Sequence, residues 1–236
     1  MTPTPSIRPH LPAKLLWAAG LILLAWAGAA LAHDVAEGDR AYVASIDGPA
    51  FIPFLYLGAK HMVTGYDHIL FLVGVVFFLR HLRDVVIYVS MFTIGHSLTL
   101  MGGVLLGTGA NSYIVDAIIG LSVVYKGIEN LGGFARLGWN FDTRLAVLIF
   151  GLFHGLGLAT KLMDLQVSPN GLLTNLIGFN LGVELGQVIV LAAVVFLLNL
   201  WRDRPSFASG ARYANIGLVI AGLALTAYQF QGYFST

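Results

Sequence analysis

The sequence contains no cysteine, which excludes disulfide bonds, thiolate metal ligands and a thiol nucleophile. Charged residues are scarce at 11% of the chain, whereas soluble domains have about 25%. The net charge is only +1 and no basic tract is present, so nothing in the sequence supports nucleic acid as a partner. A Walker A phosphate-binding loop is also missing, which argues against direct use of ATP.

What the sequence has in abundance is long apolar runs. Apolar residues make up 57% of the chain, and runs such as 70–79 and 188–198 are apolar on every face rather than alternating as barrel strands do. Since each helical span needs about 20 residues, we predict an all-α, polytopic membrane protein with six transmembrane helices. The predicted spans lie near residues 65–80, 84–107, 112–131, 145–163, 172–200 and 212–231.

The segment before the first span is apolar but too short to cross a bilayer by itself. Residues 50–61 are expected to form a re-entrant or interfacial half-helix that continues into the first span across Thr64 and Gly65. Residues 50–236 would then form the six-helix transmembrane domain, preceded by a periplasmic segment at 33–49.

The N-terminus has the pattern of a cleavable signal peptide covering residues 1–32. Arg8 and Lys14 precede an apolar core at 15–29, and a small-x-small site ends at Ala32. The alternative is an uncleaved first span. Cleavage would make His33 the first residue, able to chelate a metal through its amine and its ring, although His33 could equally have no role beyond following the site.

Arginines predict the orientation. They fall in alternate loops on one side, which the positive-inside rule assigns to the cytoplasm, at positions Arg80, Arg83, Arg136, Arg144, Arg202, Arg204 and Arg212. Only Arg40, Lys60 and Lys161 flank the other side. The mature N-terminus and the C-terminus are therefore expected outside a bacterial inner membrane, in agreement with a signal peptide.

Ionisable residues at membrane depth are costly and mark functional sites. His61 and His68 are seven residues apart, so a continuous helix would place them on one face. Asp67 would point about 100° away unless the backbone bends at Gly65 and brings it inward. Otherwise Asp67 could simply cap the helix that begins here.

Deeper in the chain, His96, His154 and Glu184 each lie near the middle of a predicted span. Glu184 forms a polar stripe with Asn180 and Gln187 at helical spacing, so it should face protein rather than lipid. Any of these residues alone could merely form a hydrogen bond between helices. Imidazoles and carboxylates spread over several spans instead favour ligands for a divalent metal ion.

Two further acidic positions have competing interpretations. Glu129 could pair locally with Lys126 or act as a ligand at the inner mouth, and Asp116 is expected to be a cap or rim charge. The predicted metal ligands are His61, Asp67, His68, His96, His154 and Glu184, with His33, Glu129 and Asn180 as further candidates. Nitrogen and oxygen donors suit Ni²⁺, Co²⁺ or Zn²⁺, and the methionines leave copper open. No prosthetic group is expected.

Several segments resemble the HupE/UreJ family of membrane proteins. The similar segments are His61-x5-Asp67-His68, residues 92–100 around His96, residues 122–130, Phe150-Gly151-Leu152-x-His154-Gly155-Leu156-Gly157 and residues 179–187 around Glu184. The resemblance implies a nickel or cobalt permease with a cleaved signal and about six spans. Lys126 departs from the apolar residue expected beside Glu129, which puts a metal-binding role of Glu129 in doubt. Residues 92–100 and 150–158 also echo each other, as a repeat of helical hairpins would.

The leading hypothesis is inward passage of a divalent transition metal ion, Ni²⁺ above all, in support of metalloenzyme maturation. Alternatives are an intramembrane metal-dependent hydrolase with Glu184 as its base, and a haem carrier with His96 and His154 as axial ligands. A metal sensor or scaffold without transport is a third. The expected partners are the metal ion and the lipid bilayer, and a homo-oligomer is possible.

Overall fold

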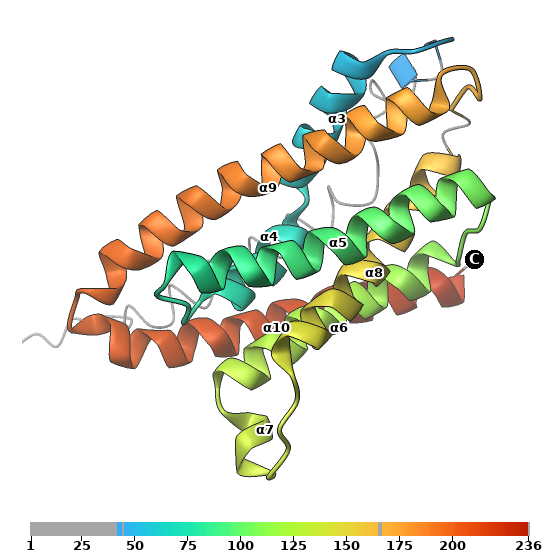
Figure 1. Ribbon diagram of the computed structural model, residues 1–236. Helices are drawn as coiled ribbons and strands as arrows, with labels where there is room; N and C mark the ends of the chain where they lie inside the picture. Colours follow the sequence, from blue (N-terminus) through green and yellow to red (C-terminus); the bar gives the residue numbers. More distant parts are fainter. Residues whose placement is uncertain (1–41, 44, 165–166, 236) are drawn as a thin grey trace, which may run out of the picture.

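The computed structural model describes residues 42–43, 45–164 and 167–235. The predicted signal peptide and His33 lie outside these residues. Within them the chain forms eight helices, α3 to α10, and no strand (Figure 1). The predicted all-helical class is therefore confirmed.

The helices follow the predicted spans closely. Their bounds are α3 Phe51–Thr64, α4 Tyr66–Val76, α5 Leu82–Leu106, α6 Ser112–Asn130, α7 Gly133–Arg136, α8 Thr143–Asp164, α9 Leu172–Arg202 and α10 Ser206–Ser235. Turns with glycine in the left-handed region end α5 at Gly107 and precede α9 at Gly171, where φ is 64° and 74°. Such angles favour glycine because it lacks a Cβ.

Four of these helices are long and apolar enough to cross a membrane: α5, α8, α9 and α10. Helix α4 is apolar but only 11 residues long, and α6 contains Asp116, Lys126 and Glu129. The chain therefore has the helices of a membrane protein, and the count of six spans stays a prediction.

The predicted half-helix is present and the backbone breaks where the sequence indicated. Helix α3 ends at Thr64 and α4 begins at Tyr66, with Gly65 between them in an extended conformation (φ −73°, ψ 97°). A Cβ on Gly65 would lie 2.9 Å from the His61 carbonyl oxygen and 3.0 Å from Nδ1 of His68. The absence of a side chain therefore lets the two half-helices bend this tightly.

The helices pack mainly as three close pairs, which are α3 with α9, α5 with α8, and α6 with α10. Glycines lie at each crossing, where an added Cβ would collide with the partner backbone. At the α3–α9 crossing a Cβ on Gly182 would meet the Leu55 carbonyl oxygen at 2.0 Å, and at the α6–α10 crossing a Cβ on Gly222 would meet that of Gly120 at 2.7 Å. Small residues allow this approach between membrane helices.

The two echoing segments meet at the α5–α8 crossing. A Cβ on Gly155 would lie 2.1 Å from the His96 carbonyl oxygen, and Thr99 Oγ1 donates a hydrogen bond to the Leu152 carbonyl oxygen at 2.7 Å. The crossing therefore places the backbone of His96 against Gly155, the neighbour of His154. Whether the echo is a true repeat stays a prediction, but its glycines serve the same contact.

Apolar side chains also cover the outer surface of the bundle. On α9, Val188, Ile189, Phe196 and Leu197 are 62–63% exposed, whereas Phe179, Val183 and Gln187 face inward. A soluble protein rarely exposes so continuous an apolar face, so this surface is the one that a lipid bilayer would cover.

The α5–α8 crossing generates a stability prediction. Gly95→Ala should lower the free energy of unfolding in detergent by about 1–3 kcal/mol, because its Cβ would lie 2.4 Å from the Leu148 carbonyl oxygen. Gly102→Ala in the same helix has nothing within 4 Å, and it should be neutral or stabilise by up to about 1 kcal/mol. Thermal unfolding of both variants measures the difference, and equal effects would contradict the close crossing.

Candidate metal site

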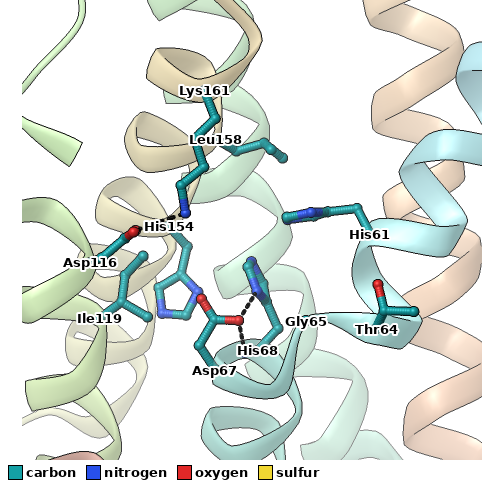
Figure 2. A pocket seen from close by; sticks show the side chains of 10 residues that line it. All are labelled: His61, Thr64, Gly65, Asp67, His68, Asp116, Ile119, His154, Leu158 and Lys161. Carbon is teal, nitrogen blue, oxygen red and sulfur yellow. Dashed lines mark hydrogen bonds and ion pairs between the residues drawn. The ribbon is translucent and has the colours of Figure 1, made fainter. Parts of the chain in front are cut away.

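A small pocket lies where α3, α4, α6 and α8 converge (Figure 2). Its volume is about 60 Å³, enough for one or two water-sized groups. The residues that line it are His61, Thr64, Gly65, Asp67, His68, Asp116, Ile119, His154, Leu158 and Lys161. Four of the six principal predicted ligands are among them.

His68 is the centre of a cluster of imidazole rings, which we call the histidine cluster (His61, His68, His96 and His154). The ring centre of His68 lies 4.7 Å from that of His154, 5.1 Å from that of His61 and 6.1 Å from that of His96. His68, His96 and His154 are at most 3% exposed. Residues far apart in the sequence, on four helices, are thus brought into one contact group.

Each ring of the histidine cluster has one buried nitrogen without a hydrogen-bond partner. These atoms are Nε2 of His61, His68 and His96 and Nδ1 of His154. Buried polar side-chain atoms are normally hydrogen-bonded, and each exception needs an explanation. The four on adjacent imidazoles are explained if these nitrogens serve as donors to a ligand that the pocket receives.

Asp67 holds His68 in the orientation that such a role requires. The bend at Gly65 does bring Asp67 inward, and its Oδ1 accepts hydrogen bonds from Nδ1 and from the backbone nitrogen of His68, each at 2.9 Å. A proton on Nδ1 leaves Nε2 with a free lone pair. Metal-binding histidines almost always donate their second nitrogen in this way, often to a carboxylate.

Ser122 is the hydrogen-bond partner of one ring nitrogen of His154, as Asp67 is of His68. Its hydroxyl donates to the Ile119 carbonyl oxygen at 2.6 Å, and its Oγ lies 3.4 Å from Nε2 of His154. Because the hydroxyl proton is already used, we assign the proton of this contact to Nε2, which leaves Nδ1 unprotonated. His154 is apparent as a candidate ligand from the sequence alone, whereas its partner Ser122 is not.

The cluster is not a closed metal cage. Among the described residues, no group of three or more histidine, aspartate or glutamate side chains stands ready to hold one ion. Imidazole nitrogens must come within about 2.0–2.1 Å of Zn²⁺ to bind it, whereas the rings here contact one another edge to face. An entering ion would therefore have to part the rings.

Part of the pocket wall is an ion pair, and this pair is not predicted from the sequence. Lys161 Nζ lies 2.9 Å from Oδ2 and 3.1 Å from Oδ1 of Asp116. Asp116 is neither a helix cap nor a free rim charge, since Asn111 caps α6 through Ile114. A signal was present, because Lys161 follows His154 by two helical turns and so shares its face.

Glu184 and Asn180 do not line the pocket. Glu184 is half-buried on α9 and accepts a hydrogen bond from Asn180 Nδ2 at 3.2 Å, while Asn180 Oδ1 has no partner. Gln187, one turn further on, accepts a hydrogen bond from Thr93 of α5 at 3.0 Å. The predicted stripe therefore faces protein, but it lies outside the pocket.

Glu129 is likewise outside the pocket. Its carboxylate bonds with Lys126 and with Thr143, so the local ion pair that the sequence suggested is present. His33, the remaining candidate ligand, lies outside the described residues.

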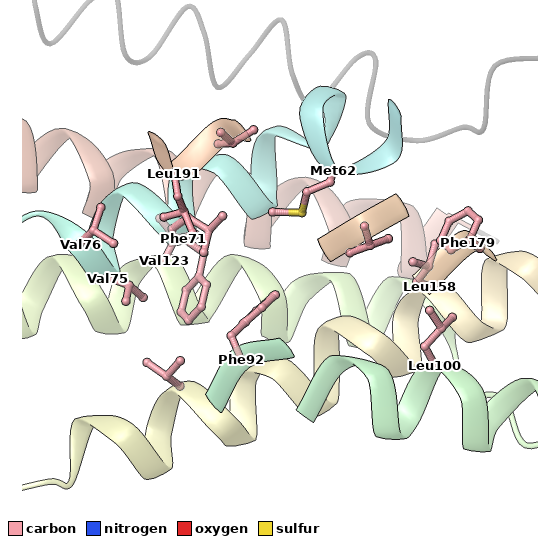
Figure 3. Close-up of a cluster of buried hydrophobic side chains, with 14 of the residues drawn as sticks. Met62, Phe71, Val75, Val76, Phe92, Leu100, Val123, Leu158, Phe179 and Leu191 are labelled. Atoms are coloured by element: carbon pink, nitrogen blue, oxygen red, sulfur yellow. The ribbon is translucent and has the colours of Figure 1, made fainter. Parts of the chain in front are cut away.

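Three phenylalanines form an aromatic layer under the histidine cluster: Phe71, Phe92 and Phe150. The ring centre of Phe71 lies 5.3 Å from His154, 5.4 Å from Phe92 and 5.8 Å from Phe150. Each phenylalanine lies about one turn from a cluster histidine, on the side away from Lys161. Phe71 and Phe92 belong to the apolar core shown in Figure 3, so aromatic rings border the histidine cluster on this side.

The comparisons with known proteins give one match. The family model described as HupE / UreJ protein matches residues 37–236, which is most of the chain. No curated protein and no solved structure matches.

The Asp67–His68 contact yields a test by metal titration. Asp67→Asn should weaken Ni²⁺ binding by about 10- to 100-fold, the usual cost of losing a partner behind a metal-binding histidine. Asp203→Asn, an exposed carboxylate at the end of α9, is the matched control and should not change the affinity. Calorimetry on purified protein measures both, and an unchanged Asp67→Asn affinity would remove Asp67 from the site.

Proposed function

Because the chain belongs to the HupE/UreJ family, which is associated with nickel and cobalt transport, we propose that it is a permease for Ni²⁺. It moves the ion inward across the bacterial inner membrane and so supplies metalloenzymes that mature in the cytoplasm. The metal is the substrate and not a resident cofactor.

One observation carries this proposal, namely the four unpartnered imidazole nitrogens around His68. Leaving polar atoms unsatisfied inside a membrane protein is costly. A cavity of about 60 Å³ beside them has room for a dehydrated ion but not for an organic substrate. The site is therefore suited to a bare cation rather than to the lipid or peptide that a hydrolase would need.

The donor set favours Ni²⁺, Co²⁺ or Zn²⁺ over Cu⁺. Imidazole nitrogen and carboxylate oxygen line the pocket, while soft thioether ligands do not. Met62 is fully buried in the core, and neither Met91 nor Met101 lines the pocket. Among the divalent ions Ni²⁺ is preferred in this proposal because of the family association.

We assign the order of events from the position of each group. His61, Asp67 and His68 capture the ion on the outer side, and His154 and His96 receive it next. Glu184 and Asn180 on α9 are proposed as later ligands. A membrane potential of about 100 mV is worth roughly 4.6 kcal/mol for a divalent ion, enough for ~10³-fold accumulation. The potential alone can therefore drive uptake.

Uptake by cells that lack their own nickel transport tests the function. His68→Ala and His154→Ala should each lower accumulated nickel at least about tenfold, because each removes a ligand nitrogen that the others cannot replace. His81→Ala is the matched control: His81 is exposed at the start of α5 and should leave uptake unchanged. Elemental analysis of washed cells gives the result.

Two outcomes would contradict the proposal. Wild-type accumulation in both cluster variants would show that the histidine cluster is not on the ion's route. Accumulation no greater than in cells without the protein would refute transport of nickel itself. Immunoblots of the membrane fraction establish that each variant is present at equal level.

A further inference from the structure

Lys161 is an unexpected residue in this pocket, because an ammonium group stands where a cation is to bind. Its side chain is 26% exposed and belongs to the wall formed by His61, Asp67, His68 and His154. In Figure 2 the side chain descends from α8 toward His154 and ends beside Asp116. A positive charge in such a place opposes the proposed ligand, so it needs a reason.

The charges that line the pocket supply a reason for the presence of Lys161. Asp67 and Asp116 each contribute a negative charge and Lys161 a positive one, while the imidazoles must be neutral to bind a metal. The empty pocket thus has a net charge of −1, and two carboxylates in a partly dehydrated site would be unfavourable without a counter-ion. Lys161 supplies that counter-ion from the chain itself.

A purely structural ion pair looks different in the same protein. Lys126 is 4% exposed and bonds Glu129, three residues away on the same helix. That pair does not line the pocket. Lys161 instead reaches from α8 to Asp116 on α6 and lies along a surface of the cavity. It is therefore placed to respond to whatever enters.

We propose that Lys161 is a tethered counter-cation that weakens metal binding and speeds release. This inference rests on the proposed function and concerns the same site. In the empty pocket the ammonium group neutralises Asp116. When a dication reaches the histidine cluster, the ammonium repels it across a few ångströms and keeps its residence short.

The physical reason for such a lysine is that the affinity of a permease for its ion has an upper limit. A site has to bind strongly enough to admit an ion and weakly enough to let it leave. Several imidazoles and two carboxylates acting without an opposing charge would hold Ni²⁺ as tightly as a structural site does. A lysine reduces the affinity without removing a ligand, so selectivity for nitrogen donors is retained.

The test is Ni²⁺ binding and release with purified full-length protein in lipid nanodiscs. Lys161→Gln should bind Ni²⁺ at least about tenfold more tightly, since one unit charge beside a dication has been removed, and it should release the ion more slowly into a chelator. Lys126→Gln removes the lysine of the ion pair within α6 and is the matched control, with affinity equal to the wild type. A lysine with only a structural role would, when lost, weaken binding and not strengthen it.

If Lys161→Gln alone is unstable, a double-mutant cycle with Asp116 tests the proposal instead. Asp116→Asn alone should weaken Ni²⁺ binding, because the positive charge of Lys161 stays while its partner becomes neutral. Adding Lys161→Gln to Asp116→Asn restores the original net charge and should return the affinity to within a few-fold of the wild type.

The outcomes separate this inference from the proposed function. Wild-type protein that binds Ni²⁺, together with Lys161→Gln that binds equally or more weakly, overturns the counter-cation and leaves the permease intact. Failure of the double variant to recover the affinity lost in Asp116→Asn overturns it as well. If the wild type binds no divalent metal, the proposed function fails and the inference falls with it.

Discussion

The structure depends on one constraint, which is the need to keep bare imidazole nitrogens inside a protein that lipid surrounds. A polar atom without a partner is costly away from water, and the bilayer offers none. In this fold the histidines are gathered around His68, and the second ring nitrogens of His68 and His154 have hydrogen-bond partners. Asp67 accepts a hydrogen bond from Nδ1 of His68, and Ser122 accepts one from Nε2 of His154. The imidazole nitrogens that remain without a partner have fixed orientations, as the ligands along a metal route must.

The backbone is shaped to maintain this arrangement. The break at Gly65 allows Asp67 and His68 to turn inward from a helix on which they would otherwise point apart. The glycine crossing of α5 and α8 brings the backbone of His96 against Gly155, next to His154. Neither device contributes a ligand atom. Both depend on glycine, whose missing side chain lets two backbone segments approach closely. Membrane helices commonly pack tightly by this means.

Much of this arrangement is visible in the sequence, and the part that is not has a common cause. Apolar length and turn residues predict the helices, and the spacing of His61 and His68 predicts that these two side chains share a face, while Gly65 marks the place where a bend could bring Asp67 inward. Periodicity, however, gives the phase of a residue on its own helix and not which helices become neighbours. Lys161 and Asp116 are 45 residues apart on α8 and α6, and nothing local joins them. For the same reason the sequence does not reveal that α9 pairs with α3, an arrangement that holds Glu184 away from the pocket.

Helix α4 links the pocket to what lies beneath it. It contains His68 of the histidine cluster and, one turn later, Phe71 of the aromatic layer. Phe71 contacts both His154 and Phe92, so it closes the apolar side of the cavity that the ion would have to cross. Gly65, a single extended residue, separates α4 from α3 and from the α3–α9 pair. Any tilt large enough to part the imidazoles around an ion also moves Phe71 relative to Phe92 and Phe150. Ion binding and the closure below it therefore involve the same short helix, and one motion would serve both.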